Sequence, residues 1–258
     1  MESMNWLKQT EEPLFPDILW ARPENKRHAG KLLIIGGHSQ NFSAVSRAYA
    51  AAQKAGAGTI RVLLPLSLQK MLAKTFPEAE FADSTPIGSF SRQALALFLE
   101  LSDWSDGVLM AGEFGRNSET AVLLENYVGK FSGQLTLAGD SLDYFFSEPQ
   151  PIVNRPKTTI AGSLSQIQKL AKTVALKQSA DLVQILNMLS IWTADTDANI
   201  ATGHSGQIII ARKGKISTTP AKNREVNEEA GAYASVWSLQ QPKKPFEALT
   251  TAVFCLTE

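Results

Sequence analysis

The sequence predicts an α/β fold of three layers, in which a mainly parallel central sheet carries helices on both faces and an antiparallel edge. Short apolar runs alternate along the chain with segments of helical periodicity, a pattern typical of a parallel sheet covered on both sides. Near the end of the chain, residues 208–218 hold two apolar runs around the turn Lys213-Gly214-Lys215, which predicts the antiparallel edge. No composition break divides the chain, so we expect residues 1–258 to form one domain.

The first clear elements follow a proline-containing start. Residues 1–25 show little periodicity and are expected to form an N-terminal arm. Residues 32–35 are a short apolar run, as in a strand buried on both faces. Alanines recur at helical spacing in residues 43–54, which predicts a helix that lies close to the sheet.

The remaining elements rest on similar patterns of periodicity and turn residues. In residues 118–127 we expect Ser118 to be the N-cap. Further strands are expected at 59–64, 107–111, 134–137, 158–160, 200–202, 207–211 and 216–218. Further helices are expected at 67–74, 91–101, 118–127, 141–146, 165–176, 181–192, 227–240 and 245–256.

Composition and charge exclude several classes of protein. Lys and Arg number 25 and Asp and Glu number 25, so no net basic charge points to nucleic acid. No run approaches the roughly 20 apolar residues of a membrane span, and residues 1–15 lack the apolar core of a signal peptide. The single Cys255 excludes an internal disulfide, so we expect a cytoplasmic protein. His28, His38 and His204 lie far apart, and we expect no metal site built from them.

Several glycine-rich motifs carry a resemblance to a known family. They are Lys26 and Gly30 in a lysine–glycine lead-in, Gly36-Gly37 with Asn41-Phe42-Ser43-Ala44, and Ala55-Gly56-Ala57-Gly58. In these motifs and their order the chain resembles the ribokinase-like superfamily, and within it most closely the ADP/ATP-dependent NAD(P)H-hydrate dehydratases. The resemblance implies a ribokinase-like fold and a homo-oligomer. It also implies repair of hydrated nicotinamide cofactors, with ADP or ATP and Mg if the activity is retained.

The resemblance also implies a pocket for a nucleotide or an NAD(P)H-like small molecule. Asn41 and Ser43 could bond a ribose hydroxyl or, alternatively, cap the following helix. The glycines are as compatible with close packing or a positive φ as with ligand contact. The pocket residues expected on this basis are Gly36, Gly37, Asn41, Ser43, Gly56, Gly58, Gly115, Asp140, His204 and Gly231.

The late helix departs from the family pattern. Tyr233 falls where the family has its catalytic aspartate, and a tyrosine with a reference pKa near 10 is a poor base at neutral pH. Glu228 and Glu229 in the first helical turn would repel a polyphosphate, and only Gly231 offers an open backbone. The sequence therefore predicts a catalytically impaired or inactive protein.

Other family positions have also lost their charged groups. Ser163 and Gln166 stand for a histidine and a glutamate, and His204-Ser205-Gly206 lacks the family lysine. Two alternatives stay open. One is an active dehydratase or small-molecule kinase that uses displaced groups, namely Asp140, Glu113, Lys26 or His204. The other is a structural partner of an active paralogue.

Overall fold

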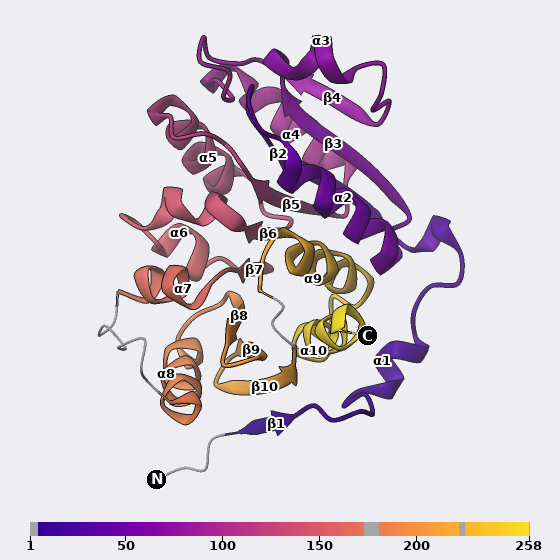
Figure 1. Ribbon diagram of the computed structural model, residues 1–258, viewed down its shortest axis with the longest axis vertical. Coiled ribbons are helices and arrows are strands. Elements are labelled where there is room, and N and C mark those ends of the chain that lie inside the picture. The colour runs from indigo at the N-terminus through magenta and orange to yellow at the C-terminus, as the bar shows by residue number, and fades with distance from the viewer. Residues whose placement is uncertain (1–4, 173–180, 222–224, 258) are drawn as a thin grey trace.

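The computed structural model describes residues 5–172, 181–221 and 225–257. Within them, strands form a single mixed sheet in the order β1-β10-β9-β8-β7-β6-β5-β2-β3-β4 (Figure 1). The strands are β1 Trp6–Lys8, β2 Lys31–Gly36, β3 Thr59–Pro65, β4 Ala79–Ala82, β5 Gly107–Gly112, β6 Gln134–Ala138, β7 Thr158–Ala161, β8 Asn199–His204, β9 Gln207–Arg212 and β10 Lys215–Pro220.

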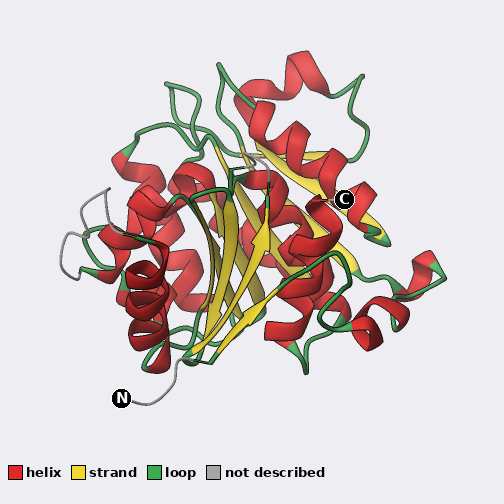
Figure 2. Ribbon diagram, turned by 60° about the horizontal axis from the view of Figure 1, so that its bottom comes forward, coloured by secondary structure: helices red, strands yellow, loops and turns green. Residues whose placement is uncertain are grey.

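Helices cover both faces of the sheet (Figure 2). One face packs against α2, α9 and α10, and the other packs against α4, α5, α7 and α8. The helices are α1 Pro16–Trp20, α2 Ser43–Ala55, α3 Gln69–Leu72, α4 Leu95–Trp104, α5 Ser118–Lys130, α6 Gln150–Val153, α7 Leu164–Ala171, α8 Leu182–Ala194, α9 Glu228–Gln240 and α10 Pro245–Thr257.

The predicted fold class is confirmed. Strands β4-β3-β2-β5-β6-β7-β8 run parallel to their neighbours, whereas β8, β9 and β10 pair antiparallel. The antiparallel edge predicted at residues 208–218 is therefore present. These antiparallel strands do not form the outer edge of the sheet, because β1 pairs in parallel with β10 beyond them.

The two helices nearest the candidate site owe their close packing to small residues. Helix α2 buries Ala44, Ala48 and Ala52 and ends at Gly56, whose φ of 87° suits a left-handed C-cap. Helix α9 likewise buries alanines and one glycine against the sheet. Because small side chains let backbones approach, α2 and α9 lie side by side over the same face (Figure 1).

The structure differs from the expected elements in places. The expected N-terminal arm contains β1 and α1, and Ile18 of α1 is buried against Trp237. Strand β4 and helix α6 were not predicted, and residues 141–145 form a 3-10 helix. The N-cap of α5 is Asn117, which accepts from the N–H of Glu119, and not Ser118. Residues 173–176 of the expected helix 165–176 lie outside the described residues.

Candidate functional site

The first part of the site is a glycine-lined floor where β2 and β5 end. The N–H of Gly37 donates to the carbonyl of Gly112 over 3.0 Å. A Cβ on Gly36 would lie 2.5 Å from that same carbonyl oxygen, so only glycine allows this approach. Gly36 and Gly37 therefore lie at the carboxyl ends of the parallel strands, where α/β folds place their ligands.

Asn41 and Ser43 lie beside this floor, at the start of α2. Asn41 closes a turn with His38 through two backbone hydrogen bonds and accepts from the N–H of Ser43 over 3.3 Å. The Ser43 hydroxyl donates to Oε1 of Glu113 over 2.8 Å. The N-terminus of α2 is capped from across the site, because the N–H of Ala44 donates to Oε2 of Glu113 over 2.9 Å. Both side chains are thus engaged with protein groups.

Glu113 and Asp140 are linked through the backbone. Glu113 has a left-handed φ of 60°, and its N–H donates to Oδ1 of Asp140 over 2.5 Å. The Asp140 residue as a whole is exposed, but protein atoms crowd its carboxyl group. This burial raises the pKa of Asp140, and the charges of Asp143 and Glu113 act in the same direction.

An ion pair joins α2 to α9. Nε of Arg47 donates to Oε1 of Glu228, a residue that is only 6% exposed. Nη1 of Arg47 also donates to the Ser43 hydroxyl over 3.2 Å. The contact with Glu228 raises the pKa of Arg47, and the charge of Glu113 adds to it. We call the connected residues Glu113, Ser43, Arg47 and Glu228 the Glu113–Glu228 network.

The N-terminus of α9 differs from the sequence-based expectation. Its N-cap is Asn227, whose Oδ1 accepts from the N–H groups of Glu229 over 3.0 Å and of Ala230 over 3.4 Å. Tyr233 lies in the second turn of α9, in a hollow that Arg47 and Cys255 also line. The residue at the helix tip, where the resemblance implies a base, is therefore Asn227 and not Tyr233.

Gly231 is also placed differently from the expectation of an open backbone. It is buried in α9, and its N–H donates to the carbonyl of Asn227 over 2.9 Å. A Cβ at this position would lie 2.8 Å from Cβ of Ala138 in β6. Gly231 therefore lets α9 pack closely on the sheet.

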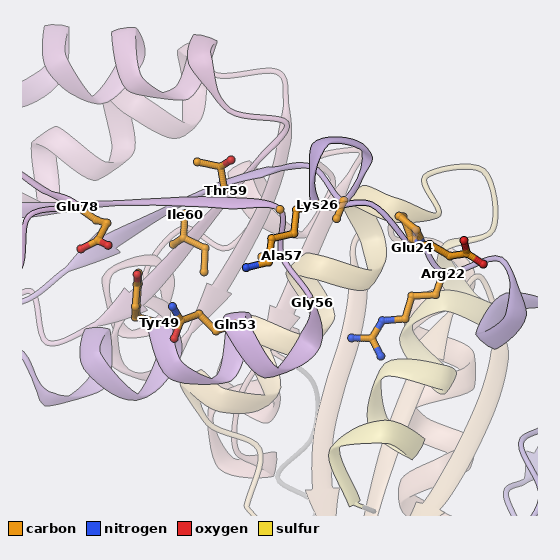
Figure 3. A pocket seen from close by; sticks show the side chains of 13 residues that line it. Arg22, Glu24, Lys26, Tyr49, Gln53, Gly56, Ala57, Thr59, Ile60 and Glu78 are labelled. Carbon is orange, nitrogen blue, oxygen red and sulfur yellow. The ribbon is translucent and has the colours of Figure 1, made fainter.

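Gly56 and Gly58 lie at the opposite end of the sheet from Gly36. Helix α2 separates the two places, and its 13 residues span about 20 Å. Figure 3 shows Gly56 together with Arg22, Lys26 and Tyr49 around a hollow of about 620 Å³. A Cβ on Gly58 would lie 2.1 Å from the carbonyl oxygen of Lys26, so this glycine serves close packing. Gly56, Gly58 and Lys26 are thus not brought together with Gly36, Asn41 and Ser43.

Gly115 and Asp140 line a second hollow, of about 480 Å³, near the floor. Gly115 has a φ of 69°, and its carbonyl accepts from the Tyr144 hydroxyl. Burial raises the pKa of Tyr144 to about 12, so its hydroxyl keeps its proton at neutral pH. Lys169 and Arg116 lie on the other walls, so the hollow contains both signs of charge.

Ser163 and Gln166, which stand for two charged residues of the family, have a structural role. The Ser163 side chain accepts from the N–H of Gln166 and the Gln166 side chain accepts in return, forming a capping box for α7. Nε2 of Gln166 also donates to the carbonyl of Gly139 over 2.9 Å and to Oδ1 of Asp143 over 3.0 Å.

His204 lies at the end of β8, where it pairs with Gln207 across the β8–β9 hairpin. A Cβ on the preceding Gly203 would point toward Val226, so the side chain of His204, one residue further along the strand, faces the opposite side of the sheet from α9. Across residues 5–172, 181–221 and 225–257, no group of three or more His, Cys, Asp or Glu side chains could hold a metal ion. None of the described helices is long and apolar enough to cross a membrane.

Sequence reasoning missed two residues that shape the site. From the sequence, Arg47 was identified only as a polar residue on the solvent-facing side of a helix, because its partner Glu228 is 181 positions away. Asn227 was counted within the helix, although an Asn followed by two glutamates is a typical N-cap signal. That signal would have placed the helix tip correctly.

Comparison with curated proteins supports the resemblance seen in the motifs. The chain is 25% identical over 194 residues to the bifunctional NAD(P)H-hydrate repair enzyme Nnr of Methanocaldococcus jannaschii, covering 72% of this chain and 38% of that protein. It is 24% identical over 159 residues to the Nnr of Moorella thermoacetica, covering 60% of this chain and 30% of that protein. The matched region thus spans about a third of the length of these relatives. No protein-family model matches the sequence.

Comparison with solved structures confirms the ribokinase-like fold. A ribokinase-like superfamily protein from Enterococcus faecalis aligns with a TM-score of 0.73 and 16% identity, covering 99% of this chain and 88% of that chain. An ADP/ATP-dependent NAD(P)H-hydrate dehydratase from Bacillus subtilis, co-crystallized with ATP and Mg²⁺, aligns with a TM-score of 0.66 and 13% identity. That alignment covers 98% of this chain and 87% of the other.

Proposed function

We propose that this protein is an NAD(P)H-hydrate dehydratase-like protein that is catalytically impaired or inactive and keeps a pocket for a nucleotide or an NAD(P)H-like molecule. The observation that carries the proposal is the chemistry at the tip of α9. An amide, Asn227, caps the helix, and a buried carboxylate, Glu228, follows it in an ion pair with Arg47.

The first supporting argument is the lack of a base at this tip. A general base must accept a proton from a substrate hydroxyl, and the carboxamide of Asn227 does not do so at neutral pH. The Asn227 side-chain oxygen is moreover occupied by two backbone N–H groups of α9. Tyr233 lies six positions further along the chain, about 9 Å of helix rise beyond Asn227, and is too far along to act in its place.

The second argument is electrostatic. Polyphosphate binding at a helix N-terminus uses free N–H groups and the positive end of the helix dipole. At α9 these N–H groups are capped, and Glu228 and Glu229 add negative charge. At α2 the carboxylate of Glu113 already accepts a hydrogen bond from the N–H of Ala44. Both helix ends that face the site are therefore filled by the protein's own anionic or amide groups.

The magnesium that would accompany ADP or ATP does not fit the carboxylates present. Mg²⁺ prefers oxygen ligands in near-octahedral geometry. Both oxygens of Glu113 accept from α2, and Oε1 of Glu228 accepts from Arg47. These two carboxylates already accept hydrogen bonds in the Glu113–Glu228 network, and among the described residues no group of three or more His, Cys, Asp or Glu side chains could hold a metal ion.

One observation favours a second candidate, an active enzyme that uses a displaced group. Burial raises the pKa of Asp140, which brings a carboxylate closer to the range useful for a base. Asp140 also lines the 480 Å³ hollow with Lys169. In this reading Asp140 would accept the substrate proton and Glu113 would have a supporting role, whereas Lys26 lies at the opposite end of the sheet and would have none.

Turnover of hydrated NADH tests the two candidates. The purified protein is incubated with hydrated NADH, ADP or ATP and Mg²⁺, and the formation of NADH is followed by absorbance. We expect no conversion above the rate without protein, and no gain in Asn227→Asp, because the tip remains acidic. Clear conversion that is lost in Asp140→Asn would reject the impaired reading and establish the second candidate.

Ligand binding is measured separately by thermal shift, because a ligand that binds only the folded state raises its apparent stability. We expect weak stabilisation by ADP and ATP at millimolar concentration, and none by phosphate. The resemblance also suggests a homo-oligomer or a complex with an active paralogue. Light scattering on the purified protein and copurification from the native cell test these two assemblies.

A further inference from the structure

A third cavity lies at the end of the sheet opposite to the Gly36 floor. It has a volume of about 400 Å³ and opens between the amino ends of β5, β6 and β7 and the last turn of α9. Arg212, at the end of the antiparallel strand β9, also lines it, as does Asn199 at the start of β8. The resemblance to the dehydratases gives this cavity no role.

Arg212 is a half-buried cation in this cavity. Its guanidinium donates to Oδ1 of Asn199, and Asn199 is only 3% exposed. Nδ2 of Asn199 donates in turn to the carbonyl of Thr158 and to Oγ1 of Thr159, each over 3.1 Å. The amide of Asn199 therefore fixes the guanidinium against the floor of the cavity.

Arg212 makes no ion pair within the part of the chain that the structure describes. The charges of two carboxylates, Asp197 and Glu247, influence Arg212. Asp197 is bound to Lys213 over 2.7 Å, and Glu247 acts only through its charge at a distance. Burial lowers the pKa of Arg212, which means that the surroundings disfavour its charge. A half-buried cation of this kind is stabilised by an anion that completes its hydrogen bonds.

The cavity contains a second cation and one acid that is already engaged. Lys157 is exposed at the mouth, with a left-handed φ of 56°. Oδ2 of Asp106 accepts from the N–H of Lys31 over 2.8 Å, so this carboxylate holds the backbone at the start of β2. Two cations and one carboxylate thus line the cavity, so the sum of their charges is positive.

An apolar wall completes the lining. Leu239, Pro242 and Pro245 line the cavity and offer carbon surface. Oγ of Ser238 and Oε1 of Gln134 have almost no accessible surface, so these two atoms lie behind the lining and are not open to a ligand.

We propose that this cavity binds a small organic carboxylate with an apolar body. The carboxylate pairs with the guanidinium of Arg212 and is attracted by Lys157. The apolar body lies against Leu239 and the two prolines. A planar guanidinium favours a carboxylate, which it can bind through two parallel hydrogen bonds.

Calorimetric titration with mandelate tests the proposal, because mandelate carries a carboxylate and an apolar ring. The neutral analogue phenylethanediol and inorganic phosphate are titrated in parallel. We expect saturable binding of mandelate, no binding of phenylethanediol, and affinity for mandelate about tenfold or more lower in Arg212→Met. Arg61→Met, which removes a strand arginine paired with Glu80, is the matched control and should leave the affinity unchanged.

A second variant covers the case in which Arg212→Met does not fold. Lys157→Gln changes an exposed residue and should weaken mandelate binding by about threefold, with an unchanged circular dichroism spectrum. Absence of saturable mandelate binding to the unmodified protein would overturn the proposal. So would equal affinity in Arg212→Met. Binding of phosphate without mandelate would show an inorganic anion site and would equally reject an organic acid.

Discussion

Nε of Arg47 in α2 donates to Oε1 of Glu228 in the first turn of α9, so an ion pair fastens the two helices that border the candidate site. The side chain of Glu228 is 8% exposed and that of Arg47 is 49% exposed. The buried carboxylate thus depends on a cation that still reaches solvent. This relationship explains why an acidic residue is tolerated at a helix tip that packs against a neighbouring helix.

Replacement of Arg47 is predicted to destabilise the fold. Arg47→Met keeps most of the side-chain volume but leaves Glu228 buried without its partner. We expect a loss of about 1–2 kcal/mol in the free energy of unfolding, less than for a fully buried pair because Arg47 is half exposed. Urea denaturation measures this loss. The double variant with Glu228→Gln should recover part of it, and purely additive effects of the two changes would contradict the coupling.

Glu113 is predicted to stabilise α2 through its charge. Glu113→Gln keeps the length of the side chain and the left-handed backbone, but it removes the carboxylate that accepts from Ser43 and Ala44. We expect a loss of about 0.5–2 kcal/mol, as for a lost helix cap. Urea denaturation gives the value, and Glu100→Gln on an exposed face of α4 is the control. Equal stability of the two variants would show that Glu113 contributes no cap.

Asp140 is predicted to lower stability as the pH rises. Because its pKa is raised in the folded protein, the folded state binds more protons than the unfolded state above the ordinary value of 3.8. Its contribution is therefore fully favourable below that pH and is lost as the pH rises through the folded-state pKa. Asp140→Asn should flatten this decline between acidic and neutral pH. Urea denaturation at several pH values measures it, and a steeper decline in the variant would contradict the sign.

Gly231 and Gly129 form a matched pair of helix glycines with opposite predicted effects. Gly231→Ala places a methyl group 2.8 Å from Cβ of Ala138, so we expect a loss of about 1–3 kcal/mol from overpacking. Gly129 in α5 has no atom within 4 Å of a Cβ, so Gly129→Ala should gain about 0.5–1 kcal/mol. Thermal unfolding of both variants checks the contrast, and a stable Gly231→Ala would mean that α9 can shift on the sheet.

The sequence was sufficient to predict those helices and strands that show a clear local pattern of apolar residues. The apolar run before Gly36 and the alanine-spaced residues 43–54 became β2 and α2 with ends shifted by one residue or less. Strand β1 could not be predicted in this way, because three residues form a strand only when β10 supplies the partner. Helix α6 and strand β4, of four residues each, are equally short. Their stability comes from packing rather than from local periodicity.

The site was harder to predict than the fold. Motif order brought Gly36 and Gly56 into one expected pocket, although α2 holds them at opposite ends of the sheet. Counting along a motif also assigned Tyr233 to the tip of α9, whereas the tip is defined by the capping geometry of Asn227. Glu113 and Arg47 could not be paired with their partners from sequence, since only the folded sheet brings them together.

Helix α9 has Asn227 at one end and Ser238 in its last turn at the other, about 17 Å apart. The two ends of α9 thus border the Gly36 floor and the Arg212 cavity. Gly231 holds the first turn of this helix against Ala138 of β6, so a change that lifts α9 off the sheet near the Arg212 cavity would also alter the contacts of Asn227.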